Sequence, residues 1–301
     1  MSGLAALISA GTITENVPLG PMTTYKSGGP ARYLMEAGST RDLQALARSV
    51  ELGDMPILVL GRGSNLVVSD AGFPGLVLRL GPAFGVIEIE GTTVRAGSAA
   101  PLPQVARASV NAGLTGLEFF VGVPGSIGGA VRQNAGCFGT ETTERLIEAN
   151  ILDLSDGETH ARTPGQLQMS YRHSNVTSSQ VVLHASFQAS PGNVAEGLGE
   201  LRRITRWRRD NQPGGTFNAG SVFKNPHGRT AGEIIDALGL KGMKVGDVAV
   251  SAKHANFFVA GPNATSSDIR RLVVAVKDRV LDETGTILET EIQFVGFEND
   301  H

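Results

Sequence analysis

The hydrophobic and polar positions of this chain follow two periods, and each change of period predicts a new element. Residues 31–36 have the pattern of a strand, and residues 56–60 form an apolar run of strand length. Between them, Ser39 and Asp42 have the spacing of a capping box, and Gly53 is placed to end a helix. The apolar positions of this helix are Leu43, Leu46, Ala47 and Val50. The pattern predicts a β-α-β unit, at whose carboxyl end ligands usually bind.

The same two periods predict elements in the rest of the chain. Strands are expected over residues 76–80, 86–90, 93–96, 181–188, 256–260 and 289–296, and a hairpin from 150–154 and 158–162. Helices are expected over 101–112, 194–210, 231–238 and 268–283. Thr23–Pro30 is a β-prone run that ends in a sharp turn. The composition changes at Ser190–Asn193, which predicts a domain boundary there.

The totals limit the classes of protein that remain. A chain of 301 residues predicts two or three domains, and 41% hydrophobic with 18% charged residues predicts a folded one. A net charge of −3 gives no bulk attraction to nucleic acid or anionic membranes. A single cysteine, Cys137, excludes an internal disulfide framework and suits a reducing compartment. No apolar run has membrane-spanning length and the start lacks a basic region, so a cytoplasmic protein without a signal peptide is expected.

A glycine-rich stretch, Phe119–Gly139, is the most unusual part of the sequence. Its residues 122–139 hold six glycines among eighteen positions, together with Phe, Val and Ile. A flexible linker would carry polar residues between its glycines, so this backbone is expected to be tightly turned and buried. One interpretation is a turn packed between two sheets. The other is an anion site, because consecutive N–H groups of a bare loop bind phosphate.

A second glycine loop favours the anion site. The strand expected over 56–60 leads directly into Gly61–Leu66. No Gly-Lys-Ser/Thr follows, so it is not a Walker loop, and Leu66 replaces the third glycine of the dinucleotide fingerprint. Two such loops predict a ligand with a diphosphate that is held outside the Rossmann scheme.

Polar residues that could perform chemistry lie in three places. Ser221 follows Gly220 between two phenylalanines and is either a turn residue or a proton donor, in which case Lys224 or Arg172 would stabilise its alkoxide. Arg172 is either a surface residue or a carboxylate-binding fork. Glu289 and Glu291 fall on one strand face, as acid/base partners or as a wet edge. The six histidines lack ligand spacing, so no metal site is predicted.

In this order, the motifs resemble those of the bacterial UDP-N-acetylenolpyruvoylglucosamine reductases, flavoenzymes of peptidoglycan precursor synthesis. The resemblance extends from about Asn16 to Gly296. The segments that carry it are Thr23–Gly29, Leu60–Asn65, Gly122–Gly139, Tyr171–Ser174, Gly220–Pro226, Lys253–Phe257 and Glu289-x-Glu291.

The resemblance implies an α+β fold in three domains. Two subdomains of a vanillyl-alcohol-oxidase-type FAD-binding region would occupy residues 1–82 and 83–190. A substrate-binding domain would occupy residues 191–301, and an alternative is that its last residues pack back on the first subdomain. It implies non-covalent FAD, with its diphosphate on the two glycine loops. The implied reaction is NADPH-dependent reduction of the enolpyruvyl ether of a UDP-sugar to UDP-N-acetylmuramate, with a hydride from flavin N5. The partners would be small molecules, and the protein a monomer.

The resemblance also assigns roles to residues. Ser221 matches the proton donor, and Arg172 and Glu291 match the pair that stabilises the enolate. The substrate-binding residues would be Tyr171, Lys224 and Asn225. The cofactor-binding residues would be Tyr25, Gly28, Gly61, Arg62, Gly63, Ser64, Asn65, Leu66, Gly122, Pro124, Gly125, Ser126, Gly128, Gly129, Asn134, Ala135 and Gly136.

The chain departs from the family pattern at three points. Gln293 stands where a basic residue commonly follows the glutamate, Asp247–Ser251 is looser than the family form, and the tyrosine-bearing insertion of the longer subclass is missing, which indicates the shorter subclass. Two other functions stay open at this point. One is an oxidase or dehydrogenase of another alcohol with the same flavin fold, and the other is a nucleotide-sugar-binding protein without catalysis.

Overall fold

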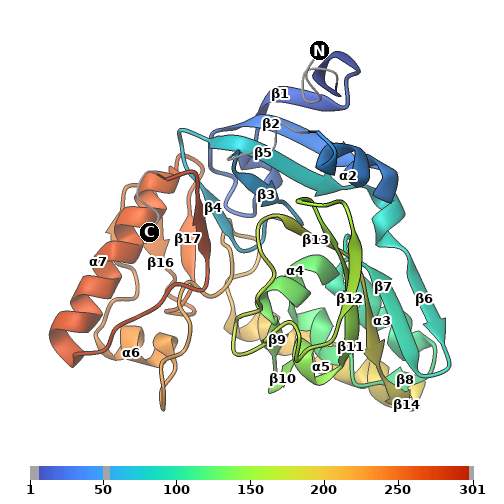
Figure 1. Ribbon diagram of the computed structural model, residues 1–301. Coiled ribbons are helices and arrows are strands. Elements are labelled where there is room, and N and C mark those ends of the chain that lie inside the picture. Colours follow the sequence, from blue (N-terminus) through green and yellow to red (C-terminus); the bar gives the residue numbers. More distant parts are fainter. Residues whose placement is uncertain (1–6, 50–54, 298–301) are drawn as a thin grey trace. The chain divides into compact units, whose positions relative to one another are not determined.

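The computed structural model describes residues 7–49 and 55–297, and their contacts divide them into two compact units (Figure 1). Of the described residues, the first unit takes those in Met1–Glu15, Tyr33–Gly61 and Gly75–Trp207. The second takes those in Asn16–Arg32, Arg62–Pro74 and Arg208–His301. Residues 191–207 therefore lie in the first unit. The division into FAD-binding subdomains that end at 82 and 190 and a substrate-binding domain that begins at 191 stays a prediction.

A four-stranded sheet contains the predicted β-α-β unit. Its strands, in the order β1-β2-β5-β3, are β1 Ile13–Pro18, β2 Pro30–Ala37, β5 Phe73–Leu80 and β3 Ile57–Val59. Helix α2 Thr40–Ala47 connects β2 and β3, and its capping box is formed, because the Ser39 N–H donates to Asp42 Oδ2 over 2.9 Å. Strands β3 and β5 are parallel. Val50 and Gly53, which were expected in this helix and at its end, lie outside the described residues.

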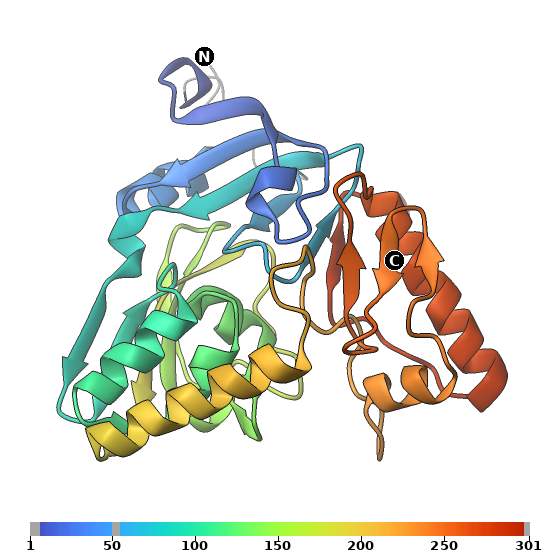
Figure 2. The ribbon, with the colours of Figure 1, turned by 180° about the vertical axis from the view of Figure 1, so that it is seen from behind.

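A five-stranded antiparallel sheet forms the larger part of the first unit. Its strands, in the order β12-β11-β13-β7-β6, are β12 Thr159–Arg162, β11 Leu146–Asp153, β13 Gln180–Gln188, β7 Thr93–Gly97 and β6 Ile87–Glu90. Helices α3 Leu102–Asn111, α4 Ile127–Gln133 and α5 Val194–Asn211 gather on one face of this sheet, which lies toward the viewer in Figure 2. One core joins them. It contains Val105 of α3, Val131 of α4, Ile204 of α5 and Phe187 of β13.

Short elements complete the first unit. They are η2 Pro82–Gly85, β8 Leu114–Thr115, η3 Glu118–Gly122, β9 Gly136–Cys137, β10 Thr140–Glu141, η4 Thr142–Glu144 and β14 Ser190–Pro191.

The glycine-rich stretch is not a loop throughout, since α4 occupies its centre and contains Gly128 and Gly129. Glycine disfavours a helix interior by about 1 kcal/mol, so the sequence did not predict this helix. A Cβ at Gly128 would lie 3.1 Å from Ser98 Cβ, tighter than nearly all such contacts. The packing of α4 against the end of β7 therefore explains a glycine that helix propensity disfavours.

The second unit combines a small sheet with two helices. Strands β15 Lys244–Val245, β16 Val248–Val250 and β17 Phe258–Ala260 are antiparallel, and β18 Gln293–Val295 pairs in parallel with β4 Leu66–Val68. Its helices are α6 Ala231–Ala237 and α7 Ser266–Thr284, and η1 is Gly20–Met22. The helix expected over 268–283 is α7, whose buried face contains Ile269, Leu272, Val273, Val276 and Val280.

Two strand predictions differ from the structure of this unit. Thr23–Gly29 forms no strand, because its backbone turns tightly behind η1. The strand expected over 289–296 is shorter, and only a single bridge, Thr290 to Phe223, precedes β18.

Candidate functional site

The two glycine loops meet in the first unit at Gly61 and Ser126. A Cβ at Gly61 would lie 2.8 Å from Ser126 Oγ, so a larger residue at this position would displace the Ser126 hydroxyl. The segment after β7 fixes the second loop, since the Gly128 N–H donates to the Ser98 carbonyl over 2.9 Å and the Leu102 N–H to the Gly125 carbonyl over 3.1 Å. Gly61, the first residue of its loop, therefore lies beside Ser126 of the second loop.

This part of the first unit fits a diphosphate. Ser98 Oγ is buried and has no hydrogen-bond partner among the residues that the structure describes. Gly129 is exposed, and the nearest atom to a Cβ there would be Ser126 Oγ at 3.8 Å. Bare backbone beside two hydroxyl groups can donate to phosphate oxygens, and a buried hydroxyl without a partner needs one. The chemistry of these residues suits the diphosphate of FAD.

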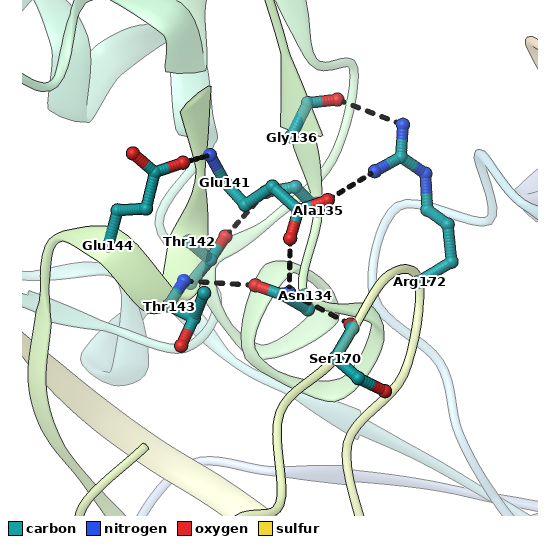
Figure 3. A network of polar contacts seen from close by, with 9 residues as sticks. All are labelled: Asn134, Ala135, Gly136, Glu141, Thr142, Thr143, Glu144, Ser170 and Arg172. Atoms are coloured by element: carbon teal, nitrogen blue, oxygen red, sulfur yellow. Dashed lines mark hydrogen bonds and ion pairs between the residues drawn. The ribbon is translucent and has the colours of Figure 1, made fainter. Parts of the chain in front are cut away.

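Asn134 connects the end of this stretch to another loop (Figure 3). It ends α4 in the left-handed conformation, with φ at 43°, and is fully buried. Its Nδ2 donates to Glu141 Oε2 over 2.8 Å and to the Ser170 carbonyl over 2.9 Å, and its Oδ1 accepts from the Thr143 N–H over 2.9 Å. The side-chain amide thus holds protein groups together, and any contact with a cofactor would involve the main chain of residues 134–136.

Arg172 lies on the loop that Asn134 holds. Its Nη2 donates to the Gly136 carbonyl over 3.2 Å, and its Nη1 lies 3.5 Å from Glu141 Oε1. The guanidinium also lies over the ring of Tyr171, 4.8 Å from the centroid. The side chain is only 17% exposed. A residue expected to be catalytic is therefore anchored directly to Gly136, a residue expected to bind the cofactor.

In the second unit, the motif Thr23–Gly29 lies beside Gly63 of the first glycine loop. The Thr24 N–H donates to the Gly63 carbonyl over 3.1 Å, and Gly63 has a φ of 61°, where a Cβ would lie 2.3 Å from the Met22 carbonyl oxygen. Tyr25 is buried in the core beside Val67, and this burial raises the pKa of its phenol well above the ordinary value. The cofactor roles of Tyr25 and Gly28 stay predictions.

Ser221 and Glu291 come together in the second unit on neighbouring extended segments. The Glu291 N–H donates to the Val222 carbonyl over 2.8 Å, and Ser221 forms a bridge with Phe257 on the other side. Asn65 reaches the same segment, because its Nδ2 donates to the Glu291 carbonyl over 2.9 Å and its own carbonyl accepts from the Gln293 N–H. A residue of the first glycine loop thus holds the main chain of the predicted catalytic glutamate.

The predicted substrate residues Lys224 and Asn225 follow Ser221. Lys224 Nζ lies 3.2 Å from Glu289 Oε2, and the carboxylate of Glu289 is 73% exposed, so the pair adds at most about 1 kcal/mol to stability. Asn225 Oδ1 accepts from the Ala231 N–H, at the start of α6. Glu289 is therefore the partner of Lys224. Arg172 belongs to the first unit, and Ser221 and Glu291 to the second.

Three residues of these surroundings were missed by the sequence analysis. Ser98 and Glu141 carry no local pattern that marks them. Asn256 lies in the motif Lys253–Phe257, which contributed to the resemblance, yet no role followed from its position. Its side chain is buried and bonds to the main chain of Phe223.

Two further features of the described residues concern metal ions and membranes. These residues contain no group of three or more His, Cys, Asp or Glu side chains that could hold a metal ion. None of their helices combines the length and apolar character of a membrane span. Cys137 donates from Sγ to the Phe119 carbonyl over 3.0 Å and lies against Gly122.

Comparison with known proteins identifies the family. Residues 31–162 match the FAD-binding domain model, and residues 212–295 match that of the UDP-N-acetylenolpyruvoylglucosamine reductase C-terminal domain. The reductase of Parvibaculum lavamentivorans is 41% identical over 290 residues, covering 96% of this chain and 93% of the relative. The reductase of Sphingopyxis alaskensis is 40% identical and covers 98% of this chain and 99% of the relative.

A solved structure agrees with this assignment. The crystal structure of UDP-N-acetylenolpyruvylglucosamine reductase (MurB) from Thermus caldophilus is 34% identical, with a TM-score of 0.81, and covers 93% of this chain and 98% of that one. The expected α+β fold is confirmed. The chain belongs to the UDP-N-acetylenolpyruvoylglucosamine reductase family, whose members are FAD-binding oxidoreductases of peptidoglycan synthesis.

Proposed function

We propose that this protein reduces the enolpyruvyl ether of UDP-N-acetylglucosamine to UDP-N-acetylmuramate with NADPH as the reductant, as a cytoplasmic monomer. FAD, when bound, supplies the transfer of a hydride from NADPH to the terminal carbon of the substrate. The observation that carries the proposal is the main-chain bond from Glu291 to Val222, which keeps Glu291 beside Ser221, the group expected to donate the proton.

The protein side chains handle the charge and the proton. After hydride addition the carbon that bears the carboxylate becomes basic, and the Ser221 hydroxyl protonates it. Charge that builds on the substrate carboxylate is stabilised by Arg172, whose paired N–H groups match a carboxylate, and by Glu291 in its protonated form, which donates a hydrogen bond. Lys224, three residues after Ser221, is the cation nearest to it in the sequence, and we assign it to the alkoxide that remains. The bare backbone around Gly61, Ser126 and Gly129 binds the diphosphate of FAD.

The substitution Ser221→Ala tests this assignment. We expect NADPH to bleach the flavin absorbance at the wild-type rate, whereas product formation falls by about 10²-fold or more, because the proton donor is lost. Stopped-flow absorbance measures the two half-reactions separately. If Ser221→Ala leaves both half-reactions at wild-type rates, another group is the acid.

The wild-type protein tests the alternatives in the same experiment. An alcohol oxidase would be reoxidised rapidly by oxygen and would not respond to the enolpyruvyl sugar. A binding protein without catalysis would be colourless and would still bind UDP-sugars. Either result would overturn the proposed reaction.

A further inference from the structure

We propose that Asn256 is a positioning residue that fixes the main chain of Ser221–Lys224 and thereby aligns the Ser221 hydroxyl for proton transfer. The inference rests on the proposed function in taking Ser221 as the proton donor. Asn256 itself makes no contact with the reacting groups in this view. It acts through the strand that carries the serine.

The side chain of Asn256 binds both polar groups of one peptide residue. Its Oδ1 accepts from the Phe223 N–H over 2.9 Å, and its Nδ2 donates to the Phe223 carbonyl over 2.8 Å. The Asn256 carbonyl also accepts from the Val222 N–H over 2.8 Å. The carboxamide therefore acts as one more strand residue, continuing on Phe223 the pairing that the main chain begins on Val222.

A second segment holds the other side of the same residues. The Lys224 N–H donates to the Glu289 carbonyl over 2.9 Å, the Glu291 N–H to the Val222 carbonyl over 2.8 Å, and Phe223 bridges Thr290. Ser221–Lys224 is thus the middle of three segments. The segment that contains Asn256 holds one edge of Ser221–Lys224, and the segment that contains Glu291 holds the other edge. Loss of the Asn256 amide would therefore free only the first edge.

Because this region is buried, no solvent can replace the hydrogen bonds of the Asn256 amide. Asn256 is 3% exposed and the ring of Phe223 is fully buried, where it packs edge-to-face on Phe258 with centroids 5.9 Å apart. Without the amide, the N–H and carbonyl of Phe223 would be buried and unpaired, which is unfavourable for each group. The strand would shift to find new partners. A displacement of about 1 Å near a reacting group can lower a rate by about 10²-fold.

The first experiment compares two variants of the flavin-loaded protein. Val276→Ala is the matched control, since Val276 is a fully buried core residue of α7 in the same unit. We expect Asn256→Ala to be reduced by NADPH within twofold of the wild-type rate and then to react with the enolpyruvyl sugar at least about tenfold more slowly. Val276→Ala should slow neither step selectively. Equal slowing of both steps by Asn256→Ala, or of neither, would overturn the proposal.

The variant Asn256→Asp gives a readout that loss of packing would not move. A protonated carboxyl can donate to the Phe223 carbonyl and accept from the Phe223 N–H, as the amide does, whereas a carboxylate can only accept. We expect the slow step to recover toward the wild-type rate as the pH falls from 8 to 5.5. The rate of the wild type at each pH serves as the reference. It corrects for any effect of protonating His254, whose Nδ1 accepts from the Asn256 N–H. No recovery would contradict the hydrogen-bond explanation.

Hydrogen exchange tests the positioning without catalysis. In Asn256→Ala, the amide proton of Phe223 should exchange at least about tenfold faster than in Val276→Ala, because only the first variant removes its acceptor. A wild-type protein that fails to reduce the sugar would overturn the proposed function, while the exchange result still decides the role of Asn256. If neither Asn256 variant folds, the amide serves the fold rather than the alignment, and the proposal fails.

Discussion

Glu141 lies between two residues of the candidate site in the first unit. Its Oε2 accepts from Asn134 and its Oε1 lies 3.5 Å from Arg172 Nη1, while its own N–H donates to Glu144 Oε1 over 2.7 Å. The side chain is 27% exposed, and each of its two carboxylate oxygens contacts one of these residues. It therefore contributes, with the Gly136 carbonyl, to the orientation of the Arg172 guanidinium (Figure 3).

Glu141→Gln removes the charge from this position and keeps the size of the side chain. Its amide can still accept from Asn134 but presents N–H groups to Arg172. A loss of about 1–2 kcal/mol of orientation would lower kcat roughly 5- to 30-fold and leave the flavin content unchanged. Steady-state kinetics and the ratio of flavin to protein absorbance measure the two quantities. Glu196→Gln, on the exposed start of α5, is the control and should match the wild type.

The glycine loops could be predicted residue by residue, but their contact could not. Gly61 and the stretch around Ser126 stand out because glycine is dense among apolar residues. That a Cβ at Gly61 would strike Ser126 follows only from the folded chain. The same holds for Asn256, because a buried asparagine and an exposed one look alike until the partner, here Phe223, is known.

At the scale of elements, the N-terminus of α7 receives an acidic residue from a distant part of the chain. Asp70 Oδ1 accepts from the Ser266 N–H over 2.8 Å, and Oδ2 accepts from the Ser267 N–H over 2.9 Å. These donors have no partner within the helix, and the helix dipole favours a negative charge there. Asp70 therefore fixes α7 to the segment that carries β4.

Asp70→Ala should lower the free energy of unfolding by about 1–2 kcal/mol, because two helix N–H groups lose their acceptor and the dipole loses a counter-charge. Urea unfolding followed by circular dichroism measures this change. Asp282→Ala, at an exposed position near the other end of α7, should change stability by less than about 0.5 kcal/mol. An equal effect of the two substitutions would show that charge alone, rather than the contact at the helix start, is responsible.

Elements with a regular apolar face were the ones that the sequence predicted. Helices α3, α5 and α7 repeat their buried residues at helical spacing, and that spacing is visible without any tertiary contact. Helix α4 was not predicted because Gly128 and Gly129, which it contains, have low helix propensity. Strand β4 was missed because three residues after a glycine loop give no period, and its partner β18 lies far along the chain.

At the scale of the whole molecule, two histidines make stability depend on pH. His184 in the first unit has a pKa below 6.5, first because burial disfavours its charged form and then because Arg95 lies beside it. Burial likewise lowers the pKa of His254 in the second unit from 6.5. A pKa that is lower in the folded state means that the unfolded chain binds protons first.

The contribution of the two neutral histidines to the free energy of unfolding should therefore be fully present above about pH 6.5. It should fall as the pH drops toward the folded-state pKa values. We expect a lower melting temperature at pH 5.5 than at pH 7.5, and a smaller difference in the double variant His184→Gln, His254→Gln. Scanning calorimetry of the apoprotein at both values measures this. The same difference in both proteins would assign the pH effect to other groups.

Cofactor binding should stabilise the whole chain, because a ligand that binds only the folded state shifts the folding equilibrium. FAD at 100 times its dissociation constant adds about 2.7 kcal/mol. A Cβ at Gly61 would lie 2.8 Å from Ser126 Oγ and would displace this hydroxyl, so Gly61→Ala should abolish most of the rise in melting temperature that FAD produces. Gly165→Ala is the control, since nothing lies within 4 Å of a Cβ there, and it should keep the full rise. Melting curves with and without FAD compare the three proteins, and a full rise in Gly61→Ala would show that FAD does not bind between these loops.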